Sequence, residues 1–277
     1  MRPALQAMIT TIMGDSLSGA SEMTSRLLQD LRAFLSNNQT VPRAEWVEFA
    51  TEVRMARPGI ATFHNIAKEI EGIANNTSIQ NWNHSITFMV ERCTDQEINA
   101  PSQIASRFVN IAQGEKFLTL SYSSTVMATL LMLKSEREIE VLVAESLPMG
   151  EGRITAKKLM KNGIKVRIIP DALMGAVIDE VDCCVVGADA ITPMGVFNKV
   201  GTRTLSTVAM AAGKTFYVLC SELKIAPLEH VEFGRKKLES EGLHELTQIF
   251  ELTPLDLVDM VVTDQRHVSP RSLTWKN

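Results

Sequence analysis

The feature that most constrains the fold of this chain is a series of short apolar runs after residue 114. Segments with helical spacing lie between several of these runs, over 125–133, 154–161 and 204–212. Apolar strands that alternate with helices form a parallel sheet whose two faces are both covered. The pattern predicts an α/β domain over residues 115–277, with strands at 117–120, 140–144, 165–169, 182–186, 215–220 and 257–262.

The first part of the chain has helical spacing instead. Apolar residues recur three and four positions apart over 5–13, 27–35, 46–53, 60–73 and 104–111. Pro58 fits a helix break or a first turn, and a further helix is expected from Pro101 to Ala112. The polar stretch 75–84 is interpreted as a loop or an exposed helix end. We therefore predict a helical N-terminal domain over residues 1–114.

Charge and composition restrict the classes of function, partner and location that are expected for this chain. Lys and Arg number 28 against 32 Asp and Glu, a formal charge of −4, which argues against a direct nucleic-acid partner. Four cysteines without a CxxC pair, and histidines without metal spacing, predict no disulfide framework, no metal and no cofactor. The same scattered cysteines predict a reducing, cytoplasmic location. Apolar stretches too short for a bilayer predict no membrane partner.

Polar residues follow the predicted strands at their carboxyl ends, where open α/β sheets bind ligands. Asp189 follows the fourth strand, and Asn198 and Lys199 return just before a predicted helix. The N–H groups of that helix start could hold an anion, so an acid and a phosphate cradle could face one pocket. The alternative is a turn-forming Asp189 and a solvated loop Lys199.

Two other stretches have alternative explanations. Ser121, Ser123 and Ser124 could bind phosphate through their hydroxyls, or could simply cap a helix. The pair Gly150 and Gly152, with Asp171 further on, resembles part of a dinucleotide fingerprint whose third glycine is missing. This fragment keeps a dinucleotide-dependent oxidoreductase open as a third hypothesis.

Two motifs carry a family resemblance. The segments 186–191 (VGADAI) and 198–202 (NKVGT) resemble the signature of the family that holds the α, β and δ subunits of translation initiation factor 2B. The same family holds methylthioribose-1-phosphate isomerase and ribose-1,5-bisphosphate isomerase. Segments 56–58, 118–126, 152–159, 163–166 and 171–172 agree with it. The resemblance implies a Rossmann-like C-terminal domain, a phosphorylated sugar or nucleotide as ligand, a homodimer or larger homo-oligomer, and a possible translation-factor partner.

The resemblance also assigns roles to residues. In the isomerases a cysteine follows the first sheet strand and an aspartate stands in the GAD element, and these positions match Ser121 and Asp189. Two positions that hold arginines in the isomerases carry Ser18 and Leu147 here. The candidate catalytic residues are thus Asp189 and Ser121, and the candidate ligand-binding residues are Ser18, Gly19, Ala20, Arg57, Ser123, Ser124, Arg153, Asn198 and Lys199.

These departures from the isomerase pattern favour a family member that binds its ligand without transforming it. A thiol ionises near pH 8.5, whereas a serine hydroxyl needs a neighbouring base, and no histidine is close in sequence. A regulatory or assembly role is therefore the first hypothesis. The alternative is an aldose–ketose isomerase of altered chemistry, in which Asp189 is the acid–base group and Ser121 or water assists it.

Overall fold

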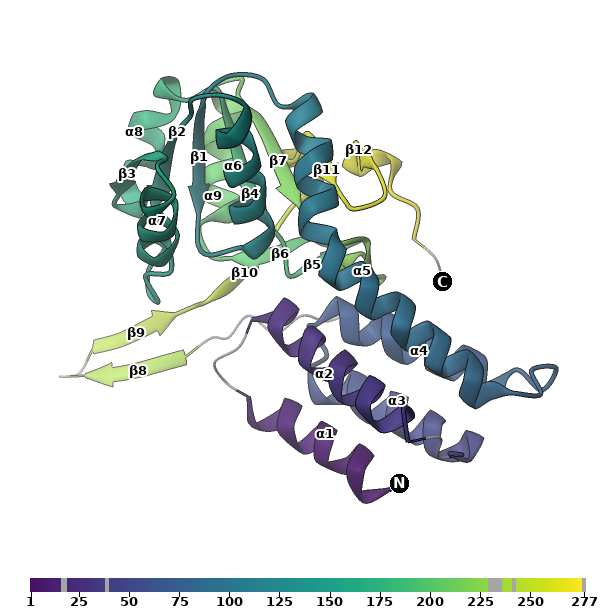
Figure 1. Cartoon of the computed structure of the whole chain (residues 1–277). Helices are drawn as coiled ribbons and strands as arrows, with labels where there is room; N and C mark the ends of the chain where they lie inside the picture. The colour runs from purple at the N-terminus through teal and green to yellow at the C-terminus, as the bar shows by residue number, and fades with distance from the viewer. Residues whose placement is uncertain (16–18, 38–39, 229–235, 241–242, 276–277) are drawn as a thin grey trace.

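Helices occupy the first part of the chain and strands dominate the second, as the sequence predicts (Figure 1). The computed structural model describes residues 1–15, 19–37, 40–228, 236–240 and 243–275. The helices of the first part are α1 (Pro3–Gly14), α2 (Ala20–Leu35), α3 (Arg43–Ala56), α4 (Ala61–Asn75) and α5 (Trp82–Ile111).

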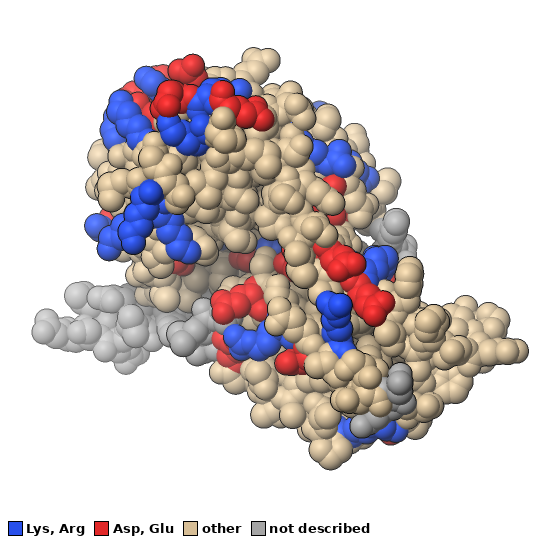
Figure 2. Space-filling model, viewed as in Figure 1, with Lys and Arg blue, Asp and Glu red and all other residues tan. Residues whose placement is uncertain are grey.

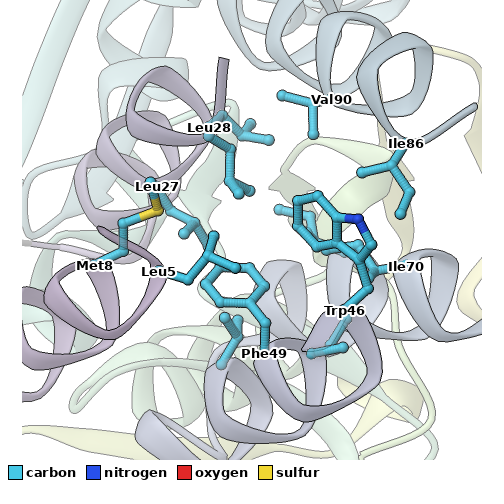
Figure 3. Close-up of a cluster of buried hydrophobic side chains, with 14 of the residues drawn as sticks. Leu5, Met8, Leu27, Leu28, Trp46, Phe49, Ile70, Ile86 and Val90 are labelled. Atoms are coloured by element: carbon cyan, nitrogen blue, oxygen red, sulfur yellow. The ribbon is translucent and has the colours of Figure 1, made fainter. Parts of the chain in front are cut away.

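The helical part has an apolar core of its own, built from the residues whose spacing predicted the helices. Figure 3 shows Leu27 and Leu28 of α2 facing Trp46 and Phe49 of α3 across this core. The rings of Trp46 and Phe49 lie edge to face, with their centroids 5.9 Å apart. Burial of such rings and aliphatic side chains is the main favourable term in helix packing.

Helix α5 is longer than the sequence predicted. The expected helix began at Pro101, but α5 begins at Trp82 and continues through this proline. An internal proline costs a helix about 3 kcal/mol. Here burial on both sides offsets that cost, because Ile86 packs in the helical core and Phe108 packs against the sheet. Because the prediction took Pro101 as the start of the helix, it missed the first half of α5.

The large sheet has the strand order β12-β11-β7-β4-β1-β2-β3. All neighbours are parallel except β12, which pairs antiparallel with β11. The strands are β1 (Lys116–Leu120), β2 (Glu140–Ala144), β3 (Lys165–Ile169), β4 (Cys183–Gly187), β7 (Thr215–Leu219), β11 (Met260–Val262) and β12 (His267–Val268). These bounds confirm the predicted strands to within a few residues.

Helices cover both faces of this sheet. One face packs against α5, α6 (Ser124–Glu136) and α7 (Gly152–Lys161), and the other against α8 (Met174–Val177) and α9 (Thr202–Ala211). Adjacent residues of a strand point to opposite faces, so Cys183 belongs to the first core and Cys184 to the second. Short 3-10 turns complete this part, at Asp171–Leu173, Ile178–Glu180, Glu222–Lys224, Leu255–Leu257 and Pro270–Ser272.

The strand order reverses between β1 and β4. From β1 the chain moves outward to β2 and β3, and then crosses back to β4 on the other side of β1. Ligands of open α/β sheets bind outside the carboxyl ends of the strands at such a reversal. The residues there are Ser121 after β1 and Asp189 just after β4.

Two further strand groups were not predicted. β5 (Ala190–Thr192), β6 (Gly195–Lys199) and β10 (Phe250–Thr253) form a small antiparallel sheet. β8 (Lys236–Ser240) and β9 (Leu243–Thr247) form a hairpin that projects from the body in Figure 1. Asn198 and Lys199 therefore end a strand instead of lying in a loop. The pairing of β6 with β10 joins residues about fifty positions apart, and local periodicity carries no signal for it.

None of the helices in the described ranges has the length and apolar character that a bilayer crossing requires.

Candidate functional site

Ser121 ends β1 in a backbone conformation that serine seldom adopts. Its φ is +61°, in the left-handed region that costs a residue with a Cβ roughly 1–2 kcal/mol. Two hydrogen bonds hold it there: its N–H donates to Ser146 Oγ at 2.6 Å, and its carbonyl accepts from Thr155 Oγ1 at 2.6 Å. Strained residues held in this way concentrate at functional sites.

The turn after β2 is strained in the same manner. Ser146 has φ +64°, and the carboxylate of Asp171 accepts from the N–H groups of Ser146 and Leu147 at 2.7 and 2.8 Å. Gly152 is required by packing, since a Cβ there would lie 1.9 Å from the Ala144 carbonyl oxygen. Asp171 and Gly152 thus have structural roles, which account for these two residues of the fragment without a dinucleotide.

Asp189 lies just beyond the carboxyl end of β4, partly buried. Its N–H donates to the carbonyl of Phe197 at 2.9 Å, while its carboxylate has no hydrogen-bond partner among the described residues. Burial raises the pKa of Asp189, and the nearby ammonium of Lys224 opposes that rise. A carboxyl group with a raised pKa at a strand reversal is a candidate acid or base.

Lys199 and Asn198 are both buried at the end of β6. The Lys199 ammonium lies 2.8 Å from Glu151 Oε1, and Asn198 Nδ2 donates to Thr202 Oγ1 at 3.0 Å. The solvated-loop alternative for Lys199 is therefore wrong. Glu151, which the sequence did not single out, already supplies the anion that this lysine faces.

The start of α9 is also occupied by a carboxylate of the chain itself. Glu251 Oε1 accepts from the N–H groups of Gly201 and Arg203 at 2.6 and 2.9 Å. The pairing of β10 with β6 sets Glu251 opposite Asn198 and so brings it to this helix end. The sequence predicted free N–H groups here for an anion, and the structure corrects this because these two donors are satisfied internally.

The start of α6 lies at the strand reversal. Ser123 caps the helix, since its Oγ accepts from the N–H of Val126 at 3.3 Å, and Ser124 is exposed beside it. A Cβ on Gly187 would come within 2.6 Å of Ser123 Oγ, so β4 and this cap lie against each other. The structure thus confirms the helix-cap alternative for Ser123, while phosphate binding by the serine run stays a prediction.

The two predicted arginines, Arg57 and Arg153, both have partners of their own in the structure. Arg57 donates to the carbonyls of Ile12, Met13 and Asp15 at the end of α1. Arg153 is exposed and pairs with Glu145 at 2.7 Å.

The N-terminal candidates lie around the start of α2. Gly19 is the residue before the helix and is exposed, and Ala20 is its buried first residue. Ser18 lies outside the described residues.

A cavity of about 210 Å³ lies between the helical part and the carboxyl edge of the sheet. The helical part contributes Ser21, Ser25, Glu97, Ala100 and Pro101, and the sheet part contributes Ser124, Thr125, Ser221 and Lys224. The sequence predicted Ser124 but missed Lys224 and Glu97. Lys224 comes soon after the end of a predicted strand, and this position could have identified it as a candidate. Glu97 lies in the half of α5 that was not predicted.

Charged side chains of both signs are visible on one face of the protein (Figure 2). On the face drawn in Figure 2, lysines and arginines are interspersed with acidic residues. Within the described ranges no three His, Cys, Asp or Glu side chains lie together as a metal ion would need.

Known proteins of one family are similar to this chain. The model of the Initiation factor 2 subunit family matches residues 16–270. The translation initiation factor eIF-2B subunit 2-like protein of Pyrococcus furiosus is 29% identical over 230 residues, which cover 81% of each chain. A ribose 1,5-bisphosphate isomerase of Archaeoglobus fulgidus is 29% identical over 174 residues, 58% of this chain and 56% of that protein.

The fold is similar as well. The crystal structure of the translation initiation factor eIF-2B of Pyrococcus horikoshii superposes with a TM-score of 0.80 at 25% identity, covering 99% of this chain and 100% of that one.

Proposed function

The chain belongs to the Initiation factor 2 subunit family, and we propose that it is a member which binds a phosphorylated sugar or nucleotide without transforming it. The ligand lies at the carboxyl edge of the sheet, beside Ser121, Asp189 and the start of α6. Binding there serves a regulatory or assembly role.

One observation carries this proposal: no ionisable thiol is available at the strand reversal. Ser121 stands where the resemblance assigns the isomerase cysteine. All four cysteines, Cys93, Cys183, Cys184 and Cys220, are buried. Burial raises the pKa of Cys220 to about 12 and that of Cys183 to about 12, so neither is a thiolate at neutral pH.

The test is a phosphorus and proton NMR time course with ribose 1,5-bisphosphate, and with methylthioribose 1-phosphate in a parallel tube. Binding without turnover broadens the phosphate resonances and produces no ketose. Appearance of the ketose at an enzymatic rate would contradict the proposal. Sharp, unchanged lines with both sugars, and with a nucleoside monophosphate, would contradict a ligand site of this class.

An isomerase of altered chemistry is the second candidate, and Asp189 is the observation that favours it. Its carboxylate has no hydrogen-bond partner among the described residues, and burial raises its pKa, which is the direction that a carboxyl group acting as a general acid or base requires. The A. fulgidus relative is named as an isomerase of ribose 1,5-bisphosphate. If ketose forms, Asp189→Asn abolishes it and Ser121→Ala slows it, whereas turnover unchanged by Asp189→Asn rules out this mechanism.

We also propose that the protein assembles as a homodimer or a larger homo-oligomer, with a translation factor as a possible further partner. Leu147, Met149 and Ile154, around the turn after β2, each leave half or more of their surface exposed. Apolar groups gathered in this way favour contact with another chain. Analytical ultracentrifugation tests this: a monomer at micromolar concentration contradicts it, and a dimer that Met149→Ser weakens supports it.

A further inference from the structure

A short segment after β7 joins the helical part of the chain to the residues around Asp189, and the proposed function gives this junction no role. It begins within the turn Glu222–Lys224 and continues to Ala226, and we call residues 223–226 the junction segment. By sequence the segment belongs to the sheet part. Its first side chain, Leu223, is nevertheless buried in the apolar core of the helical part. The junction segment therefore packs into both parts of the chain.

Asn65 of α4 holds the junction segment by its backbone. The side-chain Nδ2 of Asn65 donates to the carbonyl of Leu223 at 2.8 Å and to the carbonyl of Ile225 at 2.9 Å. A side-chain amide has two N–H donors, so both are used here. Ala61 lies one helical turn earlier on the same face of α4, and it belongs to an apolar cluster that also contains Ala190. One face of α4 thus contacts the sheet part at two places.

The junction segment in turn holds the chain on both sides of Asp189. Lys224 Nζ donates to the carbonyl of Ala188 at 2.8 Å, and the N–H of Ala226 donates to the carbonyl of Ile191 at 3.0 Å. Ile191 also forms an isolated parallel bridge with this segment. These contacts lie one residue before Asp189 and two residues after it, so the position of Asp189 depends on where the junction segment lies.

Backbone contacts of this kind matter for Asp189 because no side-chain contact fixes its carboxylate among the described residues. The N–H of Asp189 donates to the carbonyl of Phe197 at 2.9 Å, and the junction segment holds the residues around it. Groups that bind a ligand need to be held within about 0.5 Å of their productive positions. A displacement of the junction segment therefore reaches the site as a loss of affinity.

We propose that Asn65 is a positioning residue for the ligand site. By fixing the junction segment it fixes the backbone around Asp189, although Asn65 is not among the residues that line the cavity. The helical part thereby sets the affinity of a site at the carboxyl edge of the sheet. This inference rests on the proposed function, and it concerns how the site is held, whichever phosphorylated ligand fills it.

The experiment compares matched substitutions of two asparagines in the full chain. Asn65→Leu keeps the size of the side chain and removes both donors, whereas Asn65→Gln keeps the amide. The control is Asn83→Leu, at a half-buried asparagine of α5 whose amide bonds to Val41 and Trp46 within the helical part. Melting curves show that each variant is folded at the temperature of the measurements.

The first readout needs no ligand. Amide hydrogen exchange is followed by NMR at the N–H groups of Asp189 and Ala226, relative to that of Val185 in the middle of β4, which reports global opening. In Asn65→Leu this relative exchange is about 10- to 100-fold faster than in wild type, the range expected when two hydrogen bonds are lost. In Asn83→Leu it stays at the wild-type value.

The second readout is affinity, measured by calorimetric titration with ribose 1,5-bisphosphate and, separately, with AMP. Asn65→Leu weakens binding of the probe that the wild type takes up by about tenfold, because the groups at the site are misplaced. Asn65→Gln recovers at least part of both losses. Asn83→Leu leaves the affinity within about twofold of wild type, as expected for a distant and independent position.

The outcomes separate this inference from the function on which it rests. Relative exchange at Asp189 and Ala226 that is unchanged in Asn65→Leu overturns the inference, whether or not a probe binds. Affinity that is unchanged in Asn65→Leu, or weakened equally in Asn83→Leu, overturns it while the proposed function stands. A wild type that binds neither probe contradicts the proposed function and with it a ligand site for Asn65 to position. Should Asn65→Leu fail to fold, Asn65→Ala, which leaves room for water at the two carbonyls, is held to the same outcomes.

Discussion

The ammonium of Lys199 lies 2.8 Å from the carboxylate of Glu151, so the end of β6 and the start of α7 neutralise each other's charge. Lys199 is buried, while Glu151 keeps one carboxylate oxygen hidden without a hydrogen-bond partner. A ligand phosphate that approached Lys199 would have to compete with this internal carboxylate.

The Lys199–Glu151 pair gives a first prediction. Lys199→Met destabilises the fold by about 2 kcal/mol, because it leaves a partly buried carboxylate unpaired. The double variant Lys199→Met/Glu151→Gln regains much of this loss, since both charges are then absent. Urea unfolding of the four proteins of the cycle gives the coupling free energy. Strictly additive effects would show that the pair has no energetic coupling.

Helix α9 gives a second prediction through its carboxylate cap. Glu251→Ala lowers the free energy of unfolding by about 1–2 kcal/mol, because the N–H groups of Gly201 and Arg203 lose their acceptor. Sulfate then restores part of the loss by binding at the vacated helix end. The melting temperature is followed in a sulfate titration of both proteins, because sulfate also stabilises folded proteins in general. Equal sulfate responses would contradict the prediction.

The raised pKa of Asp189 gives a pH-dependent prediction. A carboxyl group whose pKa is raised by folding stabilises the protein fully below its ordinary pKa, and that contribution is lost as pH rises through the folded value. Asp189→Asn therefore melts near the wild-type temperature below about pH 4 and above it at pH 7. Asp179→Asn, at an exposed position, is the control. A variant less stable than wild type at pH 7 would show that the charged form is favoured.

Thiol chemistry gives a fourth prediction. The native protein reacts slowly with an aromatic disulfide reagent at pH 8, because its cysteines are buried and the pKa of Cys93 is raised to about 11. Ser121→Cys adds one fast-reacting thiol per chain, since position 121 is partly exposed at the end of β1. Release of the coloured thiolate measures both. A fast thiol in the native wild type would contradict the absence of an accessible cysteine on which the proposed function rests.

Much of the fold could be predicted because its signals are local. Trp46 and Phe49, three positions apart, predicted a buried helix face. The apolar run 182–186 predicted a strand of a covered sheet, and its adjacent residues Cys183 and Cys184 lie in different cores. Where the signal was not local, prediction failed. Pro101 indicated a helix start, but α5 continues through this proline. The local sequence carries no information on the packing that holds α5 together on both sides of Pro101.

The sequence by itself determined the architecture and indicated the place of the candidate site: strand and helix periodicity dictate a covered parallel sheet, and the residues after β1 and β4 lie at its reversal. Only the tertiary structure decided which charges are free there. Glu151 and Glu251 come from other elements to occupy Lys199 and the start of α9, while Glu97 and Lys224 meet at the cavity from opposite parts of the chain. The reason is physical: backbone periodicity is a property of neighbours in the chain, whereas electrostatic pairing depends on distances in space that only packing fixes.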